Sequence, residues 1–395
     1  MLEQAFYDGA SDVHIEPDDK EVFIRYRIDG ILKNVMSLPK NAHIGMVARV
    51  KVLANLKVDE HRLPQDGRFK IIYKKNKVSF RVSIIPTLYG EKVVMRLLEE
   101  NPKVMTLEQM GFQPSALEIV KHNIDKPYGM ILVTGPTGSG KTSTLYSIIN
   151  ILNTPKVNIS TIEDPIEYNI QHVNQSQANP KIGYSFANGL RALLRQDPDI
   201  IMVGEIRDND TAKIAVNAAM TGHLVLSTLH TNDALTTMPR MLEMGVPAFL
   251  VASTTNLVIA QRLVRKVCRD CVYSYQMEKE ELEELKKQVD LEKMMVIFRR
   301  EKIISDNEQT FEKLLFYKGK GCPKCNDTGY KGRTGIYEVL PVTPELAKLI
   351  TKGADKSELC KEAEKQNMLK MIEDGFIKVK NGITTIEEIL RVTKE

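Results

Sequence analysis

The fold is decided by the stretch Gly129-Met-Ile-Leu-Val-Thr-Gly-Pro-Thr-Gly-Ser-Gly-Lys-Thr142. Its first part, Met130 to Val133, is an apolar run typical of a buried strand. Its second part, Gly135 to Thr142, satisfies the pattern G-x-x-x-x-G-K-[ST] of a phosphate-binding loop. A helical pattern follows from Ser143 to Leu152. This succession of strand, loop and helix predicts a nucleotide triphosphate site.

The loop offers several kinds of group to a bound nucleotide. Its glycines let backbone N–H groups approach a phosphate chain without Cβ clashes, and the helix that follows adds free amides and the positive end of its dipole. Lys141 is predicted to neutralise the β- and γ-phosphates of ATP, and the Thr142 hydroxyl to hold Mg²⁺. The predicted contacts with ATP or ADP are Gly135, Pro136, Thr137, Gly138, Ser139, Gly140, Lys141, Thr142 and Ser143.

Composition narrows the remaining possibilities. A chain of 395 residues, 43% of them hydrophobic and 27% charged, has room for two or three ordinary soluble domains. It contains no apolar run of about 18 residues, and its N-terminus lacks the pattern of a secretory signal, so we expect no direct membrane insertion. The net charge of +4 is weak for this length, so no nucleic-acid partner is expected.

Residues 1 to about 100 have the alternation of a separate α+β domain. Asp12 to Glu16 alternates at the strand period, and Asn41 to Leu56 has helical periodicity. Arginines concentrate in this region, among them Arg25, Arg27, Arg62, Arg68, Arg81 and Arg96. Any one of them can simply cover the polar face of a half-solvated sheet. Arg68 and Arg81 are stronger candidates for function, because a γ-phosphate approached from outside needs a positive fork.

From Thr106 to about Gln261, strand patterns alternate with helical ones, which predicts a mostly parallel, wound α/β sheet. Ligands of such sheets lie outside the carboxyl ends of the strands. Three predicted strands end there in polar residues, namely Glu163, Glu205 and His230. Carboxylates at these ends suit Mg²⁺ binding and the orientation of water. A single acidic residue can merely begin a solvated loop, but three polar strand ends after one phosphate loop favour function.

Arg191 and Arg195 lie between two of these strands. They are four residues apart in a helical pattern, so they are expected to share a helix face. The sequence leaves two possibilities open, a solvated basic face and a contact with phosphate or with another subunit.

Four of the five cysteines form two C-x-x-C pairs, Cys268 with Cys271 and Cys322 with Cys325. Two such turns complete a tetrahedral Cys₄ zinc site, which is structural because no ligand position stays open. Four unliganded buried thiols are the alternative. Metal rather than disulfides indicates a reducing, cytosolic compartment. The segment between the pairs is predicted to contain one amphipathic helix, Met277 to Met295.

The rest of the chain is predicted to be mainly helical. Gly329 to Leu340 has the pattern of a loop and a strand. Residues 344 to 395 follow as a small helical bundle, with breaks expected at Gly353, Gly375 and Gly382.

Four motifs together carry a resemblance to a known family. They are the phosphate loop, Thr161 to Tyr168, Ile201 to Asp208 and Thr221 to Ala234. The last three resemble the aspartate box, the atypical Walker B motif and the histidine box of the secretion ATPases of type II secretion and type IV pilus systems. The chain is most similar to the pilus assembly motors of the PilB type. Pilus retraction motors lack the two C-x-x-C pairs, so these cysteines favour assembly or secretion.

The resemblance implies a homo-hexameric ring at the cytoplasmic face of the inner membrane. It would hydrolyse ATP to move an inner-membrane platform protein and so power pilus assembly, or pseudopilus assembly in type II secretion. The implied organisation is a PAS-like domain (1–100), a linker (101–111), a RecA-like ATPase core (112–266), a Cys₄ zinc insertion (267–330) and a C-terminal helical subdomain (331–395). Motors of this kind usually carry a further N-terminal domain, whereas here the PAS-like domain is expected almost at residue 1.

The resemblance also implies roles for the polar residues singled out above. Glu205 would orient the attacking water, Glu163 would assist with Mg²⁺ or water, and His230 would sense the phosphate. The arginines that would stabilise charge are Arg68, Arg81, Arg191 and Arg195. Two other functions are considered for the chain. One is a RecA-like nucleic-acid translocase, which the weak net charge and the absence of Trp disfavour. The other is a nucleotide-binding switch that hydrolyses little.

Overall fold

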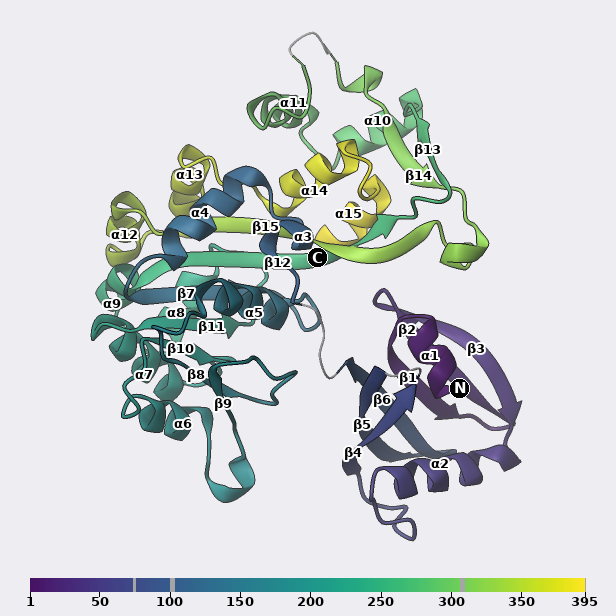
Figure 1. The fold of residues 1–395 in the computed structure, drawn as a ribbon. Helices are drawn as coiled ribbons and strands as arrows, with labels where there is room; N and C mark the ends of the chain where they lie inside the picture. Colours follow the sequence, from purple (N-terminus) through teal and green to yellow (C-terminus); the bar gives the residue numbers. More distant parts are fainter. Residues whose placement is uncertain (74–75, 100–103, 306–309, 395) are drawn as a thin grey trace. The chain divides into compact units, whose positions relative to one another are not determined.

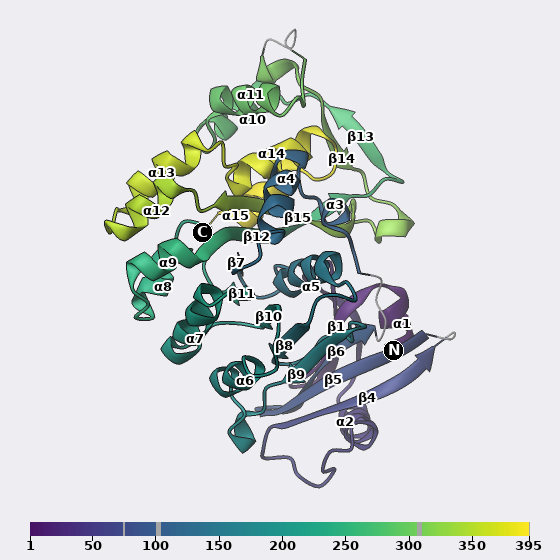
Figure 2. The same ribbon diagram turned by 60° about the vertical axis from the view of Figure 1, so that its left-hand side comes forward.

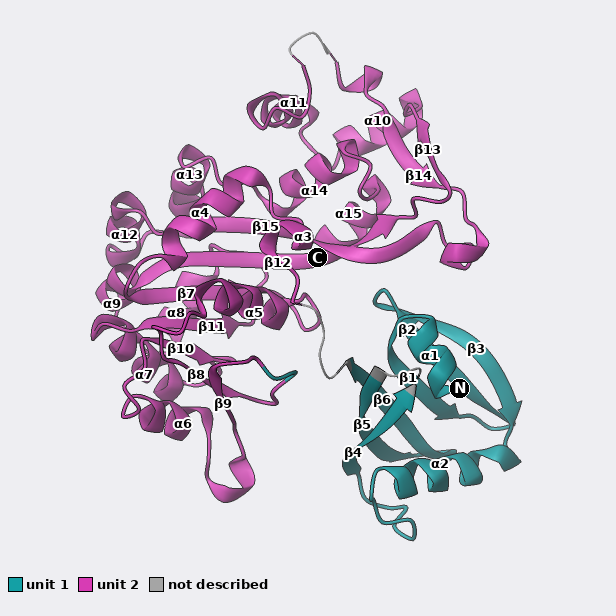
Figure 3. Cartoon of the chain, in the orientation of Figure 1, with its two compact units in different colours: residues 1–103, 167–169 teal, residues 104–166, 170–395 magenta. Residues whose placement is uncertain are grey.

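The computed structural model describes residues 1–73, 76–99, 104–305 and 310–394, which form two compact units (Figures 1 and 3). The first unit comprises residues 1–103 with 167–169, and the second comprises 104–166 and 170–395. Each unit has its own hydrophobic core. Residues 101–103 of the predicted linker lie outside the described residues. The rest of that segment contains a short helix, α3 (Leu107–Met110), which a capping box between Thr106 and Gln109 starts.

The first unit is built on a six-stranded antiparallel sheet in the order β3-β2-β1-β6-β5-β4. Its elements are α1 (Leu2–Tyr7), β1 (Ala10–Pro17), β2 (Glu21–Ile28), β3 (Ile31–Pro39), α2 (Asn41–Leu53), β4 (Gln65–Tyr73), β5 (Asn76–Thr87) and β6 (Gly90–Glu99). Phe80 and Val82 point into the core while Arg81 between them is half-exposed, as the strand period requires. Helix α2 ends at Leu53, three residues before the predicted end.

The second unit contains a seven-stranded sheet in the order β15-β12-β7-β11-β10-β8-β9. Its strands are β7 (Gly129–Thr134), β8 (Ile159–Glu163), β9 (Val173–Gln177), β10 (Ile200–Val203), β11 (Leu224–Leu229), β12 (Thr255–Val267) and β15 (Tyr330–Pro341). All pairs are parallel except β12 with β15. The predicted wound α/β sheet is therefore confirmed, although β12 continues beyond the predicted limit at Gln261.

Helices cover both faces of this sheet because its central strands are buried throughout. The helices of this part are α4 (Pro114–Ile124), α5 (Lys141–Leu152), α6 (Phe186–Leu193), α7 (Asn209–Met220), α8 (Thr237–Glu243) and α9 (Ala248–Thr254). Figure 2 shows α5 on one side of the strands and α6 and α7 on the other. No helix among the described residues is both long and apolar enough to cross a bilayer.

The segment between the two cysteine pairs differs from the prediction. Instead of one helix over Met277–Met295, it contains α10 (Lys279–Lys286) and α11 (Leu291–Arg300) beside the ribbon of β13 (Val272–Tyr275) and β14 (Phe316–Gly319). The break arises because the Asp290 side chain accepts a hydrogen bond from the Lys293 amide at 3.0 Å and so starts a second helix.

Four helices follow β15, namely α12 (Pro344–Thr351), α13 (Lys356–Lys365), α14 (Met371–Lys380) and α15 (Ile386–Thr393). Gly353 and Gly382 lie just beyond helix ends, as predicted, with φ of 71° and 70°. The break predicted at Gly375 is wrong, because Gly375 is a buried residue inside α14. A Cβ there would come within 2.7 Å of the Ile389 side chain on α15, so this glycine permits close helix packing.

Candidate nucleotide-binding site and cysteine cluster

The phosphate loop joins β7 to α5, and helix α5 begins at Lys141. Gly138 and Gly140 have φ of 80° and 88°, values that side chains rarely adopt. At Gly135 the constraint is also spatial, because a Cβ would lie 2.4 Å from the Gln261 carbonyl oxygen. The glycines of the motif therefore fit the curled backbone that wraps a phosphate chain.

Gln261 on β12 holds the phosphate loop in place through hydrogen bonds. This role was not predicted from the sequence. Its Nε2 donates to the Ser139 carbonyl at 2.7 Å, and its Oε1 accepts from the Thr144 hydroxyl at 2.7 Å. The side chain is fully buried. The available signal is an amide that directly follows the apolar run Leu257 to Ala260, because a buried amide needs partners for both of its ends.

Lys141 reaches back over the loop. Its Nζ donates to the carbonyl oxygens of Gly135 at 2.8 Å and Pro136 at 3.1 Å. Burial lowers the pKa of Lys141, and the Glu205 carboxylate opposes this shift. The Lys141 ammonium group is thus held at the phosphate loop, and Glu205 lies at the carboxyl end of β10 in the same sheet.

Two of the predicted residues, Glu205 and His230, are brought into contact. They follow the parallel neighbours β10 and β11, and His230 Nε2 lies 3.2 Å from Glu205 Oε2. The other oxygen, Oε1, accepts from Arg207 Nη2 at 2.5 Å, and this hydrogen bond raises the pKa of Arg207. The sequence did not indicate a role for Arg207, which follows Glu205 by two residues in the irregular segment after β10. The site therefore presents a carboxylate held from both sides.

The third predicted strand end, Glu163, lies deeper in the unit and is 2% exposed. Its Oε1 accepts from the Thr161 hydroxyl at 2.6 Å and from Gln175 Nε2 at 3.1 Å. Its Oε2 accepts from the hydroxyl of Tyr146 on α5, the helix of the phosphate loop. Both carboxylate oxygens are thus engaged by protein donors, and the carboxylate is tied to α5. Its role toward Mg²⁺ or water stays a prediction.

Arg68 and Arg81 lie in the first unit, directly opposite each other on β4 and β5. Arg96 on β6 lies opposite Arg81 in turn. Arg81 pairs at 3.1 Å with Glu167, which belongs to the same unit, and Arg96 pairs with Asp12 at 2.9 Å. A row of guanidinium groups therefore crosses the polar face of this sheet.

Arg191 and Arg195 are both exposed, but only Arg191 lies on a helix, because α6 ends at Leu193. Arg191 Nη1 donates to Asn188 Oδ1 at 3.0 Å, and Arg195 Nη1 donates to the Arg191 carbonyl at 2.8 Å. The two guanidinium groups are thus anchored within their own segment, and the choice between a solvated face and an interface stays open.

The four cysteines of the C-x-x-C pairs converge. All four Sγ atoms lie within 4.8 Å of one another, with Cys268 to Cys322 and Cys271 to Cys325 both at 3.9 Å. Four thiolates around zinc at about 2.3 Å are separated by roughly 3.8 Å, whereas a disulfide needs about 2 Å. Backbone amides of Cys322 and Gly329 also donate to Cys325 Sγ, which favours its thiolate form. The cluster therefore fits a tetrahedral zinc ion.

Comparison with known proteins identifies the family of the chain. The family model described as "Type II/IV secretion system protein" matches residues 1–391. The chain belongs to this family.

Curated members of this secretion family include proteins of both pilus and secretion systems. The type IV pilus assembly ATPase PilB of Pseudomonas aeruginosa is 45% identical over 396 residues, which are 100% of this chain and 66% of that protein. PilB of Acinetobacter baylyi is 44% identical, with 100% and 65% covered. The type II secretion system ATPase E of Vibrio cholerae is 45% identical, with 100% and 74% covered. The chain thus spans less than two thirds of the length of those two PilB relatives.

Solved structures agree on the fold of this family member. The pilus retraction motor PilT with bound ADP is 26% identical, with a TM-score of 0.63 over 100% of this chain and 96% of that chain. The ATPase DotB of Legionella pneumophila has a TM-score of 0.69 at 22% identity, over 99% and 93%. The chain therefore has a mixed α/β structure with a RecA-like ATPase fold.

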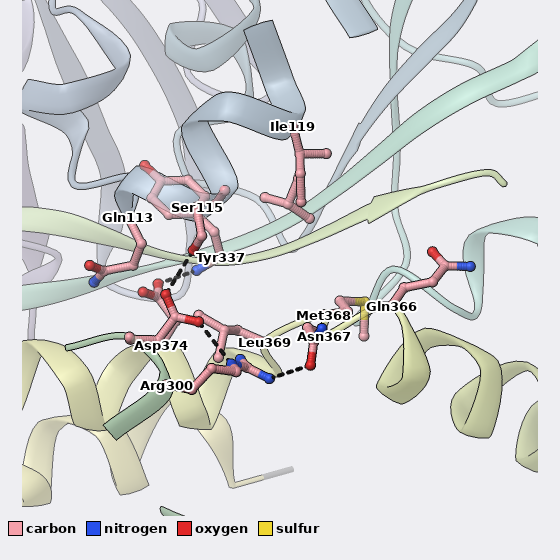
Figure 4. A pocket seen from close by; sticks show the side chains of 13 residues that line it. Gln113, Ser115, Ile119, Arg300, Tyr337, Gln366, Asn367, Met368, Leu369 and Asp374 are labelled. Carbon is pink, nitrogen blue, oxygen red and sulfur yellow. Dashed lines mark hydrogen bonds and ion pairs between the residues drawn. The ribbon is translucent and has the colours of Figure 1, made fainter. Parts of the chain in front are cut away.

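A cavity of about 270 Å³ lies elsewhere in the second unit of this secretion-family chain (Figure 4). Its walls come from α4, α11, β15, Asp374 of α14 and the segment 366–369 between α13 and α14, and none of them from the phosphate loop. Arg300 donates to Asn367 at 3.1 Å on one wall, and Asp374 accepts from the Tyr337 amide at 2.8 Å on another. The cavity thus lies where α4, the end of α11 and the segment before α14 meet the edge strand β15.

Proposed function

We propose that this protein is an ATP-hydrolysing motor that powers the assembly of type IV pili. The observation that carries the proposal is the phosphate loop with the paired Glu205 and His230 at neighbouring strand ends of the same sheet. Assembly of the pseudopilus in type II secretion is the second candidate. It is favoured by the 45% identity with a type II secretion ATPase, which equals that with a PilB protein.

The residues of the second unit divide the chemistry among them. The nine residues Gly135 to Ser143 bind ATP and ADP, and Lys141 neutralises the β- and γ-phosphates. Thr142 holds Mg²⁺, which supplies charge neutralisation at the phosphates when bound. Glu205 orients the attacking water, His230 responds to the phosphate, and Glu163 supports Mg²⁺ or water from its buried position.

The arginines of this proposal act on developing negative charge. Arg68 and Arg81 lie directly opposite each other, and like charges in that position destabilise a sheet unless a counter-charge is near. Glu167 supplies one such counter-charge to Arg81 at 3.1 Å, and a phosphate group is proposed as another. Arg191 and Arg195 are proposed for the same role, because both are exposed cations that a ligand or another subunit can reach.

At the level of the assembly, we propose a homo-hexamer that works on an inner-membrane platform protein from the cytoplasmic side. The domain organisation proposed for it is PAS-like (1–100), linker (101–111), RecA-like core (112–266), zinc insertion (267–330) and helical subdomain (331–395). Zinc bound by Cys268, Cys271, Cys322 and Cys325 is proposed as structural, because four cysteines fill a tetrahedral site.

The test is the ATPase rate measured against protein concentration, with sizing in parallel, for the wild type and Glu205→Gln. Specific activity should rise as a six-subunit species forms, and the variant should lose it while still binding ATP. A monomer that hydrolyses ATP equally fast would exclude the ring mechanism. Strong stimulation by DNA would favour a nucleic-acid translocase, and unchanged turnover of Glu205→Gln would favour a switch.

A further inference from the structure

Glu338 is a buried carboxylate on β15, 8% exposed, that none of the roles above uses. Its Oε2 accepts a hydrogen bond from the Ala234 amide at 2.9 Å, and its Oε1 accepts one from the Met371 amide at 3.2 Å. Ala234 lies four residues after His230, and Met371 is the first residue of α14. One side chain therefore joins the loop that carries His230 to the start of a C-terminal helix.

The chemistry of this contact favours an acid with two acceptors. The Met371 amide belongs to the first turn of α14 and has no acceptor within its helix, and a helix N-terminus attracts negative charge. Both hydrogen bonds come from backbone amides, and burial raises the pKa of Glu338. A hydrophobic residue of similar size would avoid the cost of burying a carboxylate but would leave both amides unpaired. The residue is thus suited to holding two backbone segments in register.

The loop from His230 to Thr236 is held at two further points. The Thr231 amide donates to the Thr134 hydroxyl at 2.9 Å, at the end of β7 where the phosphate loop begins. Asp233 pairs with Lys356 of α13 at 2.7 Å. One of these contacts faces the nucleotide site and the other faces the C-terminal helices, so the loop lies between them.

Helix α14 is itself fastened to β15. Asp374 accepts from the Tyr337 amide at 2.8 Å and from Lys378 Nζ at 2.6 Å, and Figure 4 shows Asp374 beside Tyr337. Lys378 Nζ also donates to the Gly335 carbonyl at 2.6 Å. The start of α14 and the strand that carries Glu338 consequently form one tightly bonded element.

We propose that Glu338 is a positioning residue that couples the His230 loop to helix α14. In this arrangement the contact between His230 and Glu205 depends on where α14 lies, and a change at the nucleotide site is passed to the C-terminal helices. The catalytic consequence rests on the proposed ATPase function. The structural coupling itself does not.

The test compares Glu338→Gln and Glu338→Ala with a matched control, Glu388→Gln. Glu388 is also a buried carboxylate of the second unit, but it binds Arg265 and Arg391 instead of the His230 loop. Amide hydrogen exchange of residues 231–236 and 371–375 is measured on the full chain without nucleotide, and kcat and KM for ATP are measured on the assembled protein.

Losing either hydrogen bond should raise exchange in both segments together by about tenfold or more, and kcat should fall while KM for ATP stays within about threefold. Glu338→Gln keeps the shape and loses one acceptor, so its effect should be the smaller one. The control lies on α15, whose Ile389 packs against Gly375 of α14, so it should leave residues 231–236 unchanged even where residues 371–375 respond. If Glu338→Ala does not fold, Glu338→Gln decides.

Wild-type exchange in both segments of Glu338→Gln and Glu338→Ala would overturn the coupling. Equal effects in the Glu388→Gln control would also overturn it, because they would reveal only a general loss of stability. A wild type without ATP turnover would instead refute the proposed function, and the exchange result would still decide the coupling.

Discussion

Buried polar side chains hold the nucleotide loop and the strand ends in place. Gln261 engages both the loop and helix α5, at Ser139 and Thr144, while Glu163 engages α5 through Tyr146. Both side chains are buried, so their hydrogen bonds are stronger and more costly to leave unmade than the same bonds in water. At the scale of single residues, the geometry of the site therefore depends on residues that do not touch the phosphates.

Replacing Gln261 with Leu keeps the volume but leaves the Ser139 carbonyl and the Thr144 hydroxyl without this partner. The unpaired groups cost about 1–3 kcal/mol, and we expect ATP affinity to fall by roughly tenfold. Calorimetric titration with ATP measures this. Gln288→Leu, in an exposed turn, is the control. Unchanged affinity in a folded Gln261→Leu variant would contradict the prediction.

The sequence indicates which of these residues have functional side chains, but it does not determine their hydrogen-bond partners. The phosphate loop and the positions of Glu205 and His230 at strand ends follow from the motif and the strand pattern, whereas the contact between the two comes from the structure. Two partners of Glu163, Tyr146 and Gln175, come from α5 and β9, and a pattern along one strand contains no information about such tertiary contacts. Arg207 and Gln261 were missed for the same reason.

At the scale of elements, helix α15 is fastened to β12 by one acid between two arginines. Glu388 is buried, and it binds Arg265 at 2.8 Å and Arg391 at 2.6 Å. Burial opposes ionisation, but the hydrogen bonds from Arg391 and Arg265 outweigh it and lower the pKa of Glu388 to about 2. The contact therefore favours the ionised carboxylate.

Because this pKa is lower in the folded state than in the unfolded state, the stabilisation is complete above about pH 4.5 and is lost as pH falls toward 2. The shift corresponds to about 3 kcal/mol. The free energy of unfolding of wild type minus that of Glu388→Gln should shrink over this interval, measured by denaturant titration at several pH values. Glu243→Gln, in an exposed pair, should show no comparable trend.

Two glycines in helices should respond in opposite ways to alanine. Gly375 in α14 packs against Ile389 at a distance that leaves no room for Cβ, so Gly375→Ala should cost about 1–3 kcal/mol. Gly45 in α2 has nothing within 4 Å of the added Cβ, so Gly45→Ala should gain about 0.5–1 kcal/mol from helix propensity. Thermal unfolding of both variants tests this, and a shift of the same sign in both would refute it.

Removing the proposed zinc should loosen the segment from Cys268 to Cys325 and leave the central sheet intact. We expect about one zinc per chain by elemental analysis. A chelator, or Cys322→Ser, should raise amide exchange in α10 and α11 much more than in β7. Cys360→Ser is the control, because Cys360 lies outside the cluster. A metal-free protein with unchanged exchange would show that the thiols do not need an ion.

Element boundaries were predictable where burial alone determines them. Strand β7 was expected at Met130–Val133 and is Gly129–Thr134, because a fully apolar run has one stable environment. Two other features were not predictable from the sequence. The division into α10 and α11 depends on one helix cap, and the continuity of α14 through Gly375 depends on a contact with α15.

At the scale of the whole molecule, each of the two units buries apolar residues of its own among the residues that the structure describes, and the phosphate loop lies in the second unit. The core of the first unit and that of the second share no residues, so calorimetry at a concentration that keeps the protein monomeric should resolve two transitions. ATP with Mg²⁺ should stabilise the second unit, which contains the phosphate loop, by about 2.7 kcal/mol at one hundred times the dissociation constant. One transition that shifts as a whole would contradict this.

The pairing of β12 with β15 has a consequence for how this molecule can change over evolutionary time. Cys268 directly follows β12, Cys325 precedes β15 by a few residues, and the two strands are antiparallel neighbours. The segment between them, which includes α10 and α11, is thus an extended loop between two paired strands, and its two ends lie next to each other. When the two ends of a loop are held in place, each doubling of its length raises the free energy of closing it by only about 0.6 kcal/mol. This loop can therefore be lengthened, shortened or exchanged as a module while the sheet that carries the phosphate loop keeps its register.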